Sequence, residues 1–214
     1  ISLLLWLVIL TEFLKGPLRP RLIPVLLLKH GLIVRSQLFE THQVIGNPMS
    51  TVQRYSNWNV DELIVLDISR GEDYHDLRRD DLQQSYLGTS VLDVLREIAQ
   101  VCFMPLTFGG RVRSIGDLES RLEVGADKVS LNTITYDNPS LVEEAARRFG
   151  TQCIVASVDV RMCANKDWSV FVDGGRRDTG MNPIEWCREL EARGVGEIFL
   201  NSIDRDGSGT GYDI

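Results

Sequence analysis

The stretch Val60–Ser69, VDELIVLDIS, decides the fold because it occurs twice in the chain. Its second copy is VGEIFLNSID at Val195–Asp204, which keeps the Val, the Glu and the Ile at the same spacing. A second pair lies upstream of these copies at nearly the same separation, IPVLLLK at Ile23–Lys29 and VASVDVR at Val155–Arg161. Two matches in the same order predict that one half of the fold duplicates the other.

Apolar segments rich in Val, Ile and Leu recur along the whole chain. These runs are continuous rather than alternating, which is typical of strands that are buried on both faces of a parallel sheet. We expect six such strands, at Leu22–Leu28, Leu63–Ile68, Pro105–Phe108, Lys128–Leu131, Cys153–Val158 and Ile198–Ile203.

Helix signals separate these strands. Asn followed by Pro predicts an N-cap and a first helical residue, and the pair occurs at Asn47, Asn138 and Asn182. Gly150 and Gly194 predict where the last two of these helices end. The alternation of strand and helix predicts an α/β fold with right-handed crossovers, in which the helices cover the sheet.

The duplication favours a barrel made of two halves, with residues 19–214 forming its first six βα units. A closed (βα)8 barrel needs two more units, so we expect a barrel truncated after strand 6 and a natural chain that continues past Ile214. The apolar start ISLLLWLVIL is too short to span a bilayer and lacks the basic flank of a signal peptide. We interpret residues 1–18 as an extension outside the fold.

Charge and composition exclude several classes of function. A formal net charge of −7 argues against a nucleic-acid surface, so any bound phosphate must be held locally. Four cysteines without a Cys-x-x-Cys pair indicate free thiols in a reducing compartment, and we expect a cytoplasmic protein without a zinc site. All three histidines lie in the first half of the chain, which gives little support to a Ser-His-Asp or metal-histidine mechanism.

Asp159 is the strongest candidate for catalysis from the residues alone. It ends an expected strand, and the carboxyl-terminal strand ends of a barrel line the active site, where a carboxylate can act as general acid or base. The alternative is an aspartate that caps the following turn. Its counterpart under the repeat is Leu27, which cannot transfer a proton. Asp67 and Ser202 also end strands and are expected at the same mouth.

Glycine clusters follow three strands, at Gly109-Gly110, at Gly174-Gly175 and at Gly207, Gly209 and Gly211. Glycine lets backbone N–H groups approach an anion closely, so these turns favour phosphate binding at the mouth of the barrel. The last cluster also resembles a calcium loop. We reject a calcium site because Ser208 stands at the fifth loop position and the bidentate Glu is missing.

Charged residues stand at the opposite ends of four strands. They are either solvated strand termini or a ring of alternating charge that closes the bottom of the barrel. A ring requires mutual pairing, because the unpaired burial of a charge is costly. The four residues are Arg21, Glu62, Lys128 and Glu197.

Six motifs, KHG, VDELIVLDIS, FGG, GADKVSLNT, NPSLVEEAARRFG and GVGEIFLNSIDRDG, give the chain a resemblance to the cyclase subunit of imidazole glycerol phosphate synthase. The resemblance implies a (βα)8 TIM barrel of the histidine-biosynthesis type that uses no cofactor and no metal. It also implies a heterodimer with a glutaminase subunit, which delivers ammonia at the bottom of the barrel. At the top, that ammonia closes the ring of imidazole glycerol phosphate and releases an aminoimidazole carboxamide ribotide.

The resemblance further implies roles for individual residues. Asp159 matches one of two catalytic aspartates, and the other falls on Leu27. The four charged residues at the bottom match an ammonia gate, and Asp127 matches a residue that contacts the partner. The residues expected to bind a phosphorylated or anionic substrate are Arg35, Asp67, Gly109, Gly110, Asn132, Thr133, Asp206 and Gly207, with Arg111 in place of a third glycine.

Leu27 gives the chain the Leu-Leu-Leu motif of a paralogous branch that installs acetamidino groups on polysaccharide sugars. The favoured hypothesis is therefore an ammonia-using subunit for acetamidino-sugar synthesis in surface polysaccharide, which works with a glutaminase and a third sugar-amidating enzyme. The alternatives are a genuine cyclase of L-histidine biosynthesis, in which another carboxylate replaces the lost aspartate, and a non-catalytic scaffold that activates a glutaminase. No nucleic-acid or membrane partner is expected.

Overall fold

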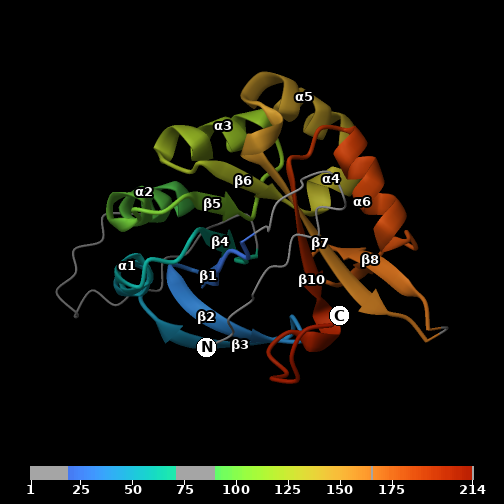
Figure 1. Cartoon of the computed structure of the whole chain (residues 1–214), viewed down its shortest axis with the longest axis horizontal. Helices are drawn as coiled ribbons and strands as arrows, with labels where there is room; N and C mark the ends of the chain where they lie inside the picture. Colours follow the sequence, from blue (N-terminus) through green and yellow to red (C-terminus); the bar gives the residue numbers. More distant parts are fainter. Residues whose placement is uncertain (1–18, 71–89, 165, 214) are drawn as a thin grey trace.

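The computed structural model describes residues 19–70, 90–164 and 166–213, and this part of the chain forms one curved sheet with helices around its outer side (Figure 1). The six expected strands are confirmed as the parallel strands of this sheet, in the order β1, β4, β5, β6, β7, β10. Their bounds are Val25–Lys29, Leu63–Asp67, Leu106–Gly109, Lys128–Leu131, Ile154–Met162 and Glu197–Ser202. The expected extension at residues 1–18 lies outside the described residues.

The sheet contains ten strands within the described residues, so four strands accompany the six parallel ones that the apolar runs predicted. A hairpin of β2 (Leu32–Gln37) and β3 (Thr41–Gly46) follows β1, and β8 (Trp168–Val172) and β9 (Arg177–Asp178) extend antiparallel from β7. The residues of β3 and β9 are mostly exposed. Backbone pairing rather than burial therefore stabilises these strands, and an apolar run does not mark them.

The parallel strands are buried on both faces, as their composition predicts. Leu26, Leu28 and Phe108 face outward and pack with the helices, whereas Val25 and Phe199 face the interior of the barrel. The interior cluster consists of Ile23, Val25, Ile64, Val155 and Phe199, with Leu27 and Leu66 packed against it. The alternation of inward and outward side chains follows from the two-residue period of a strand.

Side-chain caps fix the starts of most helices. Asn47 caps α1 (Pro48–Asn57) and Asn182 caps α6 (Pro183–Ala192), and in each helix Pro is the first residue. Asn138 and Pro139 begin α5 (Pro139–Phe149) as predicted, but the Asn138 side chain accepts a hydrogen bond from the Ser140 hydroxyl instead of from the backbone. Capping boxes start α2 (Val91–Val101) at Ser90 and α3 (Ile115–Val124) at Ser114, and α4 (Thr133–Asp137) is short.

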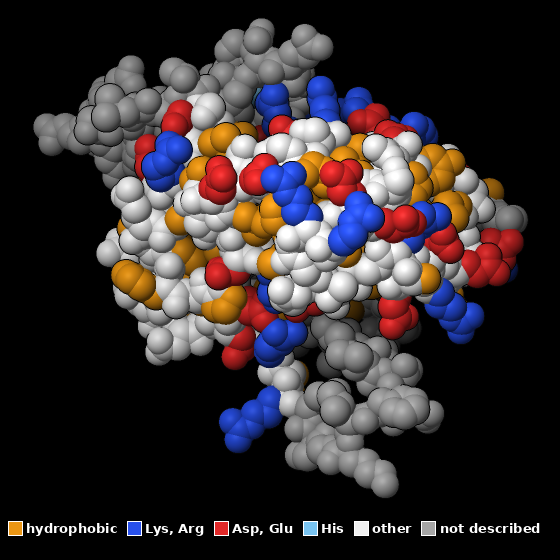
Figure 2. All heavy atoms as spheres, turned by 90° about the horizontal axis from the view of Figure 1, so that it is seen from above, with side chains coloured by type: hydrophobic (Ala, Val, Ile, Leu, Met, Phe, Trp, Pro, Cys, Tyr) orange, Lys and Arg blue, Asp and Glu red, His pale blue; other side chains and the backbone are white. Residues whose placement is uncertain are grey.

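The helix layer is held by packing and by ion pairs between neighbouring helices. Arg148 on α5 pairs with Glu119 on α3, and Arg193 after α6 pairs with Glu143 on α5. Figure 2 shows a face on which basic and acidic side chains are interspersed over apolar ones. Exposed pairs of this kind contribute at most about 1 kcal/mol each, so the buried apolar clusters dominate stability. None of the described helices is long and apolar enough to cross a membrane.

Candidate active site

The carboxyl ends of the parallel strands form a mouth, which opens into a cavity of about 2360 Å³. Most of the residues expected at the top of the barrel line this cavity. They are Leu27, Arg35, Asp67, Gly110, Arg111, Asn132, Thr133, Asp159, Asp206 and Gly207. Gly109 lies next to them at the end of β5. Segments that are far apart in the sequence therefore meet at one end of the sheet.

Asp159 projects from β7 into the interior of the barrel and is only 5% exposed. Its Oδ2 accepts a hydrogen bond of 3.0 Å from Asn132 Nδ2, and its Oδ1 accepts one of 2.8 Å from Asn201 Nδ2. Burial raises the pKa of the Asp159 carboxyl to about 6, although the two amides act in the opposite direction. Both protonation states are then populated near neutral pH, as a general acid or base requires.

Leu27 lies on β1 in parallel register with Leu66 on β4. Both leucines pack against the apolar interior cluster. The end of the first strand therefore presents an isobutyl group to the mouth, and Leu27 itself cannot exchange a proton with a substrate.

Asp67 is 3% exposed, and its carboxylate is engaged by Ser69. Its Oδ1 accepts hydrogen bonds from the backbone N–H of Ser69 at 3.0 Å and from the Ser69 hydroxyl at 2.6 Å. The same hydroxyl accepts a bond of 2.8 Å from the backbone N–H of His30. Burial raises the pKa of Asp67, against the effect of these bonds and of the Arg111 and Arg121 charges. The side chain thus ties the loop after β4 to the turn after β1.

Close packing explains the glycines that follow β5. A Cβ atom at Gly109 would lie 2.7 Å from side-chain atoms of Leu66 and Ser130. Gly110 has a φ of +96°, and a Cβ atom there would lie 1.9 Å from the carbonyl oxygen of Asp67. The fit of β5 between β4 and β6 requires both glycines, whatever they bind. Arg111 also adopts a positive φ, of 57°.

Asn132 and Thr133 join the end of β6 to two neighbouring segments. Asn132 Nδ2 donates to the carbonyl oxygen of Ser157 at 2.9 Å as well as to Asp159. The Thr133 hydroxyl donates to Asn132 Oδ1 at 3.1 Å, which fixes the orientation of that amide. The Thr133 oxygen also accepts a bond of 2.9 Å from the backbone N–H of Asp173 in the turn between β8 and β9.

Asp206 and Gly207 hold the tip of the β2–β3 hairpin. The backbone N–H of Leu38 donates to the Asp206 carbonyl, and that of Phe39 donates to Asp206 Oδ2, each at 3.0 Å. A Cβ atom at Gly207 would lie 2.2 Å from the Ser36 carbonyl oxygen. In Figure 1 the hairpin accordingly reaches the segment after β10. Arg35 lies on β2 of this hairpin, exposed at the edge of the cavity.

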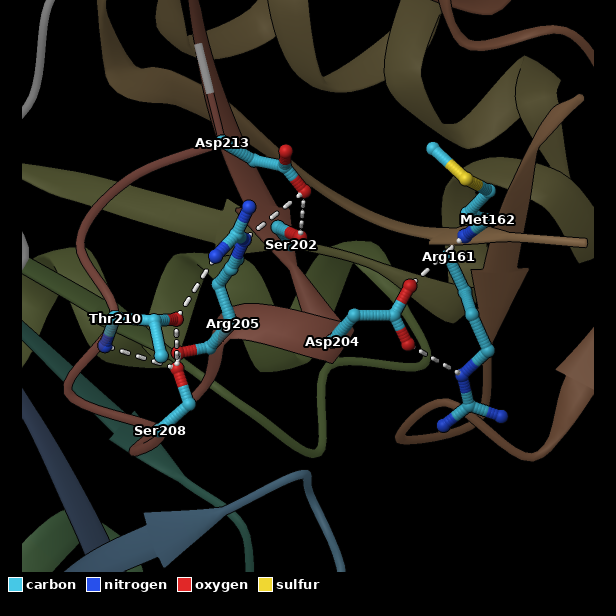
Figure 3. A network of polar contacts seen from close by, with 8 residues as sticks. All are labelled: Arg161, Met162, Ser202, Asp204, Arg205, Ser208, Thr210 and Asp213. Atoms are coloured by element: carbon cyan, nitrogen blue, oxygen red, sulfur yellow. Dashed lines mark hydrogen bonds and ion pairs between the residues drawn. The ribbon is translucent and has the colours of Figure 1, made fainter. Parts of the chain in front are cut away.

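The segment after β10 is held by a polar network on its other side (Figure 3). Asp204 accepts a bond of 3.0 Å from the backbone N–H of Met162 and pairs with Arg161 at 3.7 Å. Asp213 accepts a bond of 3.0 Å from Ser202 and pairs with Arg205 at 3.7 Å. These contacts tie the loop that carries Asp206 to the ends of β7 and β10.

The four charged residues at the opposite end of the barrel form one connected chain, here called the charged cluster. Glu62 pairs with Arg21 and accepts a bond of 2.8 Å from Lys128 Nζ, which also contacts Glu197 at 2.7 Å. Burial alone would lower the pKa of Lys128, but Glu197 and Glu62 raise it above its usual value. A cavity of about 20 Å³ adjoins the cluster on its interior side, between Thr107 and Phe199.

Asp127 is exposed at this end of the barrel, one residue before β6. Its Oδ2 accepts a bond of 2.8 Å from the backbone N–H of Leu106, and its own N–H donates to the Leu106 carbonyl at 2.8 Å. These bonds fix the entry of β6 beside β5.

Buried hydroxyl groups lie on the interior face between the charged cluster and Asp159. Thr107, Ser130 and Ser157 alternate with residues that face the helices, and each is less than 9% exposed. The side chains of β1, β4 and β10 on the interior are apolar at the same level. The interior thus has a polar side that connects Lys128 to Asp159. Sequence reasoning did not identify these hydroxyls or Asn201, because a buried polar residue within an apolar run carries no local signal.

Within the described residues, no group of three or more His, Cys, Asp or Glu side chains could hold a metal ion. The chemistry that these residues themselves offer is proton exchange at Asp159 and ion pairing in the charged cluster.

The chain is similar to known proteins over almost its whole length. A family model described as histidine biosynthesis protein matches residues 21–214. Imidazole glycerol phosphate synthase subunit HisF of Wolinella succinogenes is 40% identical over 199 residues, which is 92% of this chain and 73% of the relative. The protein of the same name from Gluconacetobacter diazotrophicus is 41% identical over 197 residues, which is 92% of this chain and 71% of the relative. The chain therefore belongs to the histidine biosynthesis protein family.

Proposed function

We propose that this chain is the ammonia-using cyclase subunit of an imidazole glycerol phosphate synthase. The observation that carries the proposal is that two polar sites lie at opposite ends of the same barrel interior. Lys128 and its two carboxylates lie at one end, and the buried carboxylate of Asp159, with a pKa of about 6, lies at the other. The names of the two relatives support the same function.

In this proposal a glutaminase subunit docks on the face that carries the charged cluster and Asp127. Arg21, Glu62, Lys128 and Glu197 act as the gate, which excludes water and ammonium while neutral ammonia passes. Ammonia then follows the polar side of the interior, because the hydroxyls of Thr107, Ser130 and Ser157 offer hydrogen bonds at the level where the opposite side is apolar.

At the mouth, ammonia attacks a bound ribotide that carries phosphate groups. Asp159 accepts a proton from the attacking nitrogen and returns it to the leaving group, which its near-neutral pKa permits. We assign anion binding to Arg35, to the turn at Gly109 and Gly110, and to Asn132 and Thr133. Asp67, Asp206 and Gly207 shape the walls of this site through the contacts they make with neighbouring loops.

A second candidate is an ammonia-using subunit for acetamidino-sugar synthesis, in which a third enzyme performs the amidation. One specific observation favours it. Leu27 removes a proton-transfer group from the mouth, while the charged cluster at the other end remains paired. A third candidate is a scaffold that activates a glutaminase. The combination of Leu27 at the mouth and a paired charged cluster at the other end supports it as well.

Single-turnover ring closure with free ammonia separates these candidates. The chain is mixed with ribotide substrate and ammonium chloride, and imidazole glycerol phosphate is measured by mass spectrometry. We expect product from the unmodified chain and none from Asp159→Asn. Absence of product from a folded chain over the pH range 6–9, in which the fraction of neutral ammonia rises steeply with pH, would overturn the cyclase proposal and leave the second and third candidates.

A further inference from the structure

We infer that Asn201 is a positioning residue for Asp159, which holds one carboxylate oxygen and so fixes the orientation in which the carboxyl meets the substrate. The inference rests on the proposed function, because it concerns the same site. Asn201 was not among the residues that the sequence indicated, and it enters only through its place on β10.

Asn201 and Asp159 are register partners on adjacent parallel strands, so strand pairing itself brings the two side chains together. Asn201 Nδ2 lies 2.8 Å from Asp159 Oδ1 and 3.3 Å from the Ser157 hydroxyl, and the residue is only 8% exposed. Asn132 donates to Oδ2 from the other side, at 3.0 Å. The carboxylate therefore lies between two neutral amide donors, one on each neighbouring strand.

The two amides are not equivalent. Asn132 is also bonded to the backbone of Ser157 and to Thr133, so its loss would disturb the end of β6. Among the described residues, Asn201 Nδ2 donates to the side chains of Ser157 and Asp159 and to no backbone group. A change at Asn201 therefore acts mainly on the carboxylate, which makes this residue the cleaner test.

The internal repeat supports a specific pairing. The repeat places Leu27 at the position of Asp159 and Leu66 at the position of Asn201. In the structure Leu27 pairs with Leu66 in the same parallel register in which Asp159 pairs with Asn201. One half of the barrel thus has an apolar pair at this level and the other half has a carboxylate with an amide donor. The amide donor Asn201 therefore occurs in the half that carries the Asp159 carboxylate, and the half without a carboxylate has Leu66 at that position.

Hydrogen bonds to a buried carboxylate stabilise its charged form and fix its orientation. Without Asn201, the Asp159 carboxylate loses its donor at Oδ1 and keeps those at Asn132 and Ser157, and the side chain gains rotational freedom about its χ2 angle. The charged form is then less stable, so the carboxyl holds its proton to higher pH. A shift of about one pH unit upward is expected, since a hydrogen bond to a charged group is worth about that much.

The test is a ¹³C NMR titration of the Asp159 carboxyl in the full chain, with the signal assigned by its loss in Asp159→Asn. We compare Asn201→Leu, which removes the donor at similar size, with Asn201→Thr, which keeps a donor. The matched control is Leu200→Asn, which changes the preceding residue of β10, an exposed side chain on the opposite side of the strand from Asn201. The same variants are assayed for ring closure with free ammonia as a function of pH.

We expect the titration midpoint to move upward in Asn201→Leu, to return toward the original value in Asn201→Thr, and to stay unchanged in Leu200→Asn. Where ring closure is present, its acid limb should move with the midpoint and kcat should fall more than KM rises. An unchanged midpoint in a folded Asn201→Leu chain overturns the inference. If that variant does not fold, an unchanged midpoint in Asn201→Ala overturns it equally.

The titration also separates this inference from the proposed function. A shifted midpoint in a chain that closes no ring supports the role of Asn201 and rejects the cyclase. Ring closure with an unshifted midpoint supports the cyclase and rejects the role of Asn201.

Discussion

Leu27 on β1 lies opposite Leu66 on β4 in the parallel register that, in the other half of the barrel, places Asp159 opposite Asn201. The two halves of the repeat therefore share a backbone arrangement and differ in what it presents at the mouth. One half presents hydrocarbon and the other a hydrogen-bonded carboxylate with a raised pKa.

Leu27→Asp is expected to increase the rate of ring closure with free ammonia by about 10²-fold, the lower range for a missing acid or base. Leu27 is half-buried at the mouth, where an aspartate can reach both the cavity and solvent. The rate is measured by single-turnover product formation. Leu27→Asn is the control, because it has nearly the same shape without a titratable group. Equal rates for the two variants would contradict the prediction.

The raised pKa of Asp159 predicts how stability depends on pH. The folded chain binds the Asp159 proton more tightly than the unfolded chain, with a pKa of about 6 against 3.8. This group therefore stabilises the fold as the pH falls from about 7 to about 4, by up to about 3 kcal/mol, and the gain is lost as the pH rises through 6.

Urea unfolding of the unmodified chain and of Asp159→Asn at pH 7 and pH 4 measures this effect. Other titrating groups contribute equally to both proteins, so the difference between the two free energies of unfolding isolates Asp159. We expect the unmodified chain to gain stability relative to Asp159→Asn when the pH is lowered from 7 to 4. A difference that is independent of pH would show that the carboxyl titrates alike in both states.

Glu62→Gln is expected to destabilise the fold by about 3 kcal/mol, because it leaves Arg21 and Lys128 without their shared carboxylate near the barrel interior. The matched control is Glu119→Gln, whose partner Arg148 is about half exposed, and which should cost less than 1 kcal/mol. Both values come from urea unfolding.

The same variant tests the gate. Glutamine-driven ring closure, with the glutaminase partner present, is expected to fall in Glu62→Gln. Ring closure with free ammonia is expected to persist, because ammonia from solution can enter at the mouth. Equal loss of both activities would argue against a gating role for the charged cluster.

Gly110→Ala is expected to destabilise the fold by about 3 kcal/mol, because its φ is +96° and the new Cβ atom would collide with the Asp67 carbonyl oxygen. Gly180→Ala is the control, since Gly180 also has a positive φ but nothing lies within 4 Å of the added atom. The control should cost only about 1 kcal/mol, the backbone strain alone. Similar costs for both, measured by thermal unfolding, would contradict the role of close packing.

The sequence by itself determined the parallel core of this protein, the carboxylate at the mouth of the barrel and the charged cluster at its opposite end. Continuous apolar runs identified the six parallel strands, because burial on both faces leaves a local signal that needs no knowledge of the partner strand. Asp159 could be found because it interrupts such a run at its end. The charged cluster could be found because its members stand at strand starts, which meet at one end of any parallel sheet.

Only the tertiary structure decided which side chains meet. Asn201 donates to a residue 42 positions away, and that contact depends on the register of two strands rather than on either sequence alone. The β2–β3 hairpin reaches the loop at Asp206 across 167 positions, through a bond from the Phe39 N–H to the Asp206 carboxylate and a backbone bond from the Leu38 N–H. Local sequence specifies burial and turns, whereas register and loop contacts arise from long-range pairing of the whole sheet, which no single stretch encodes.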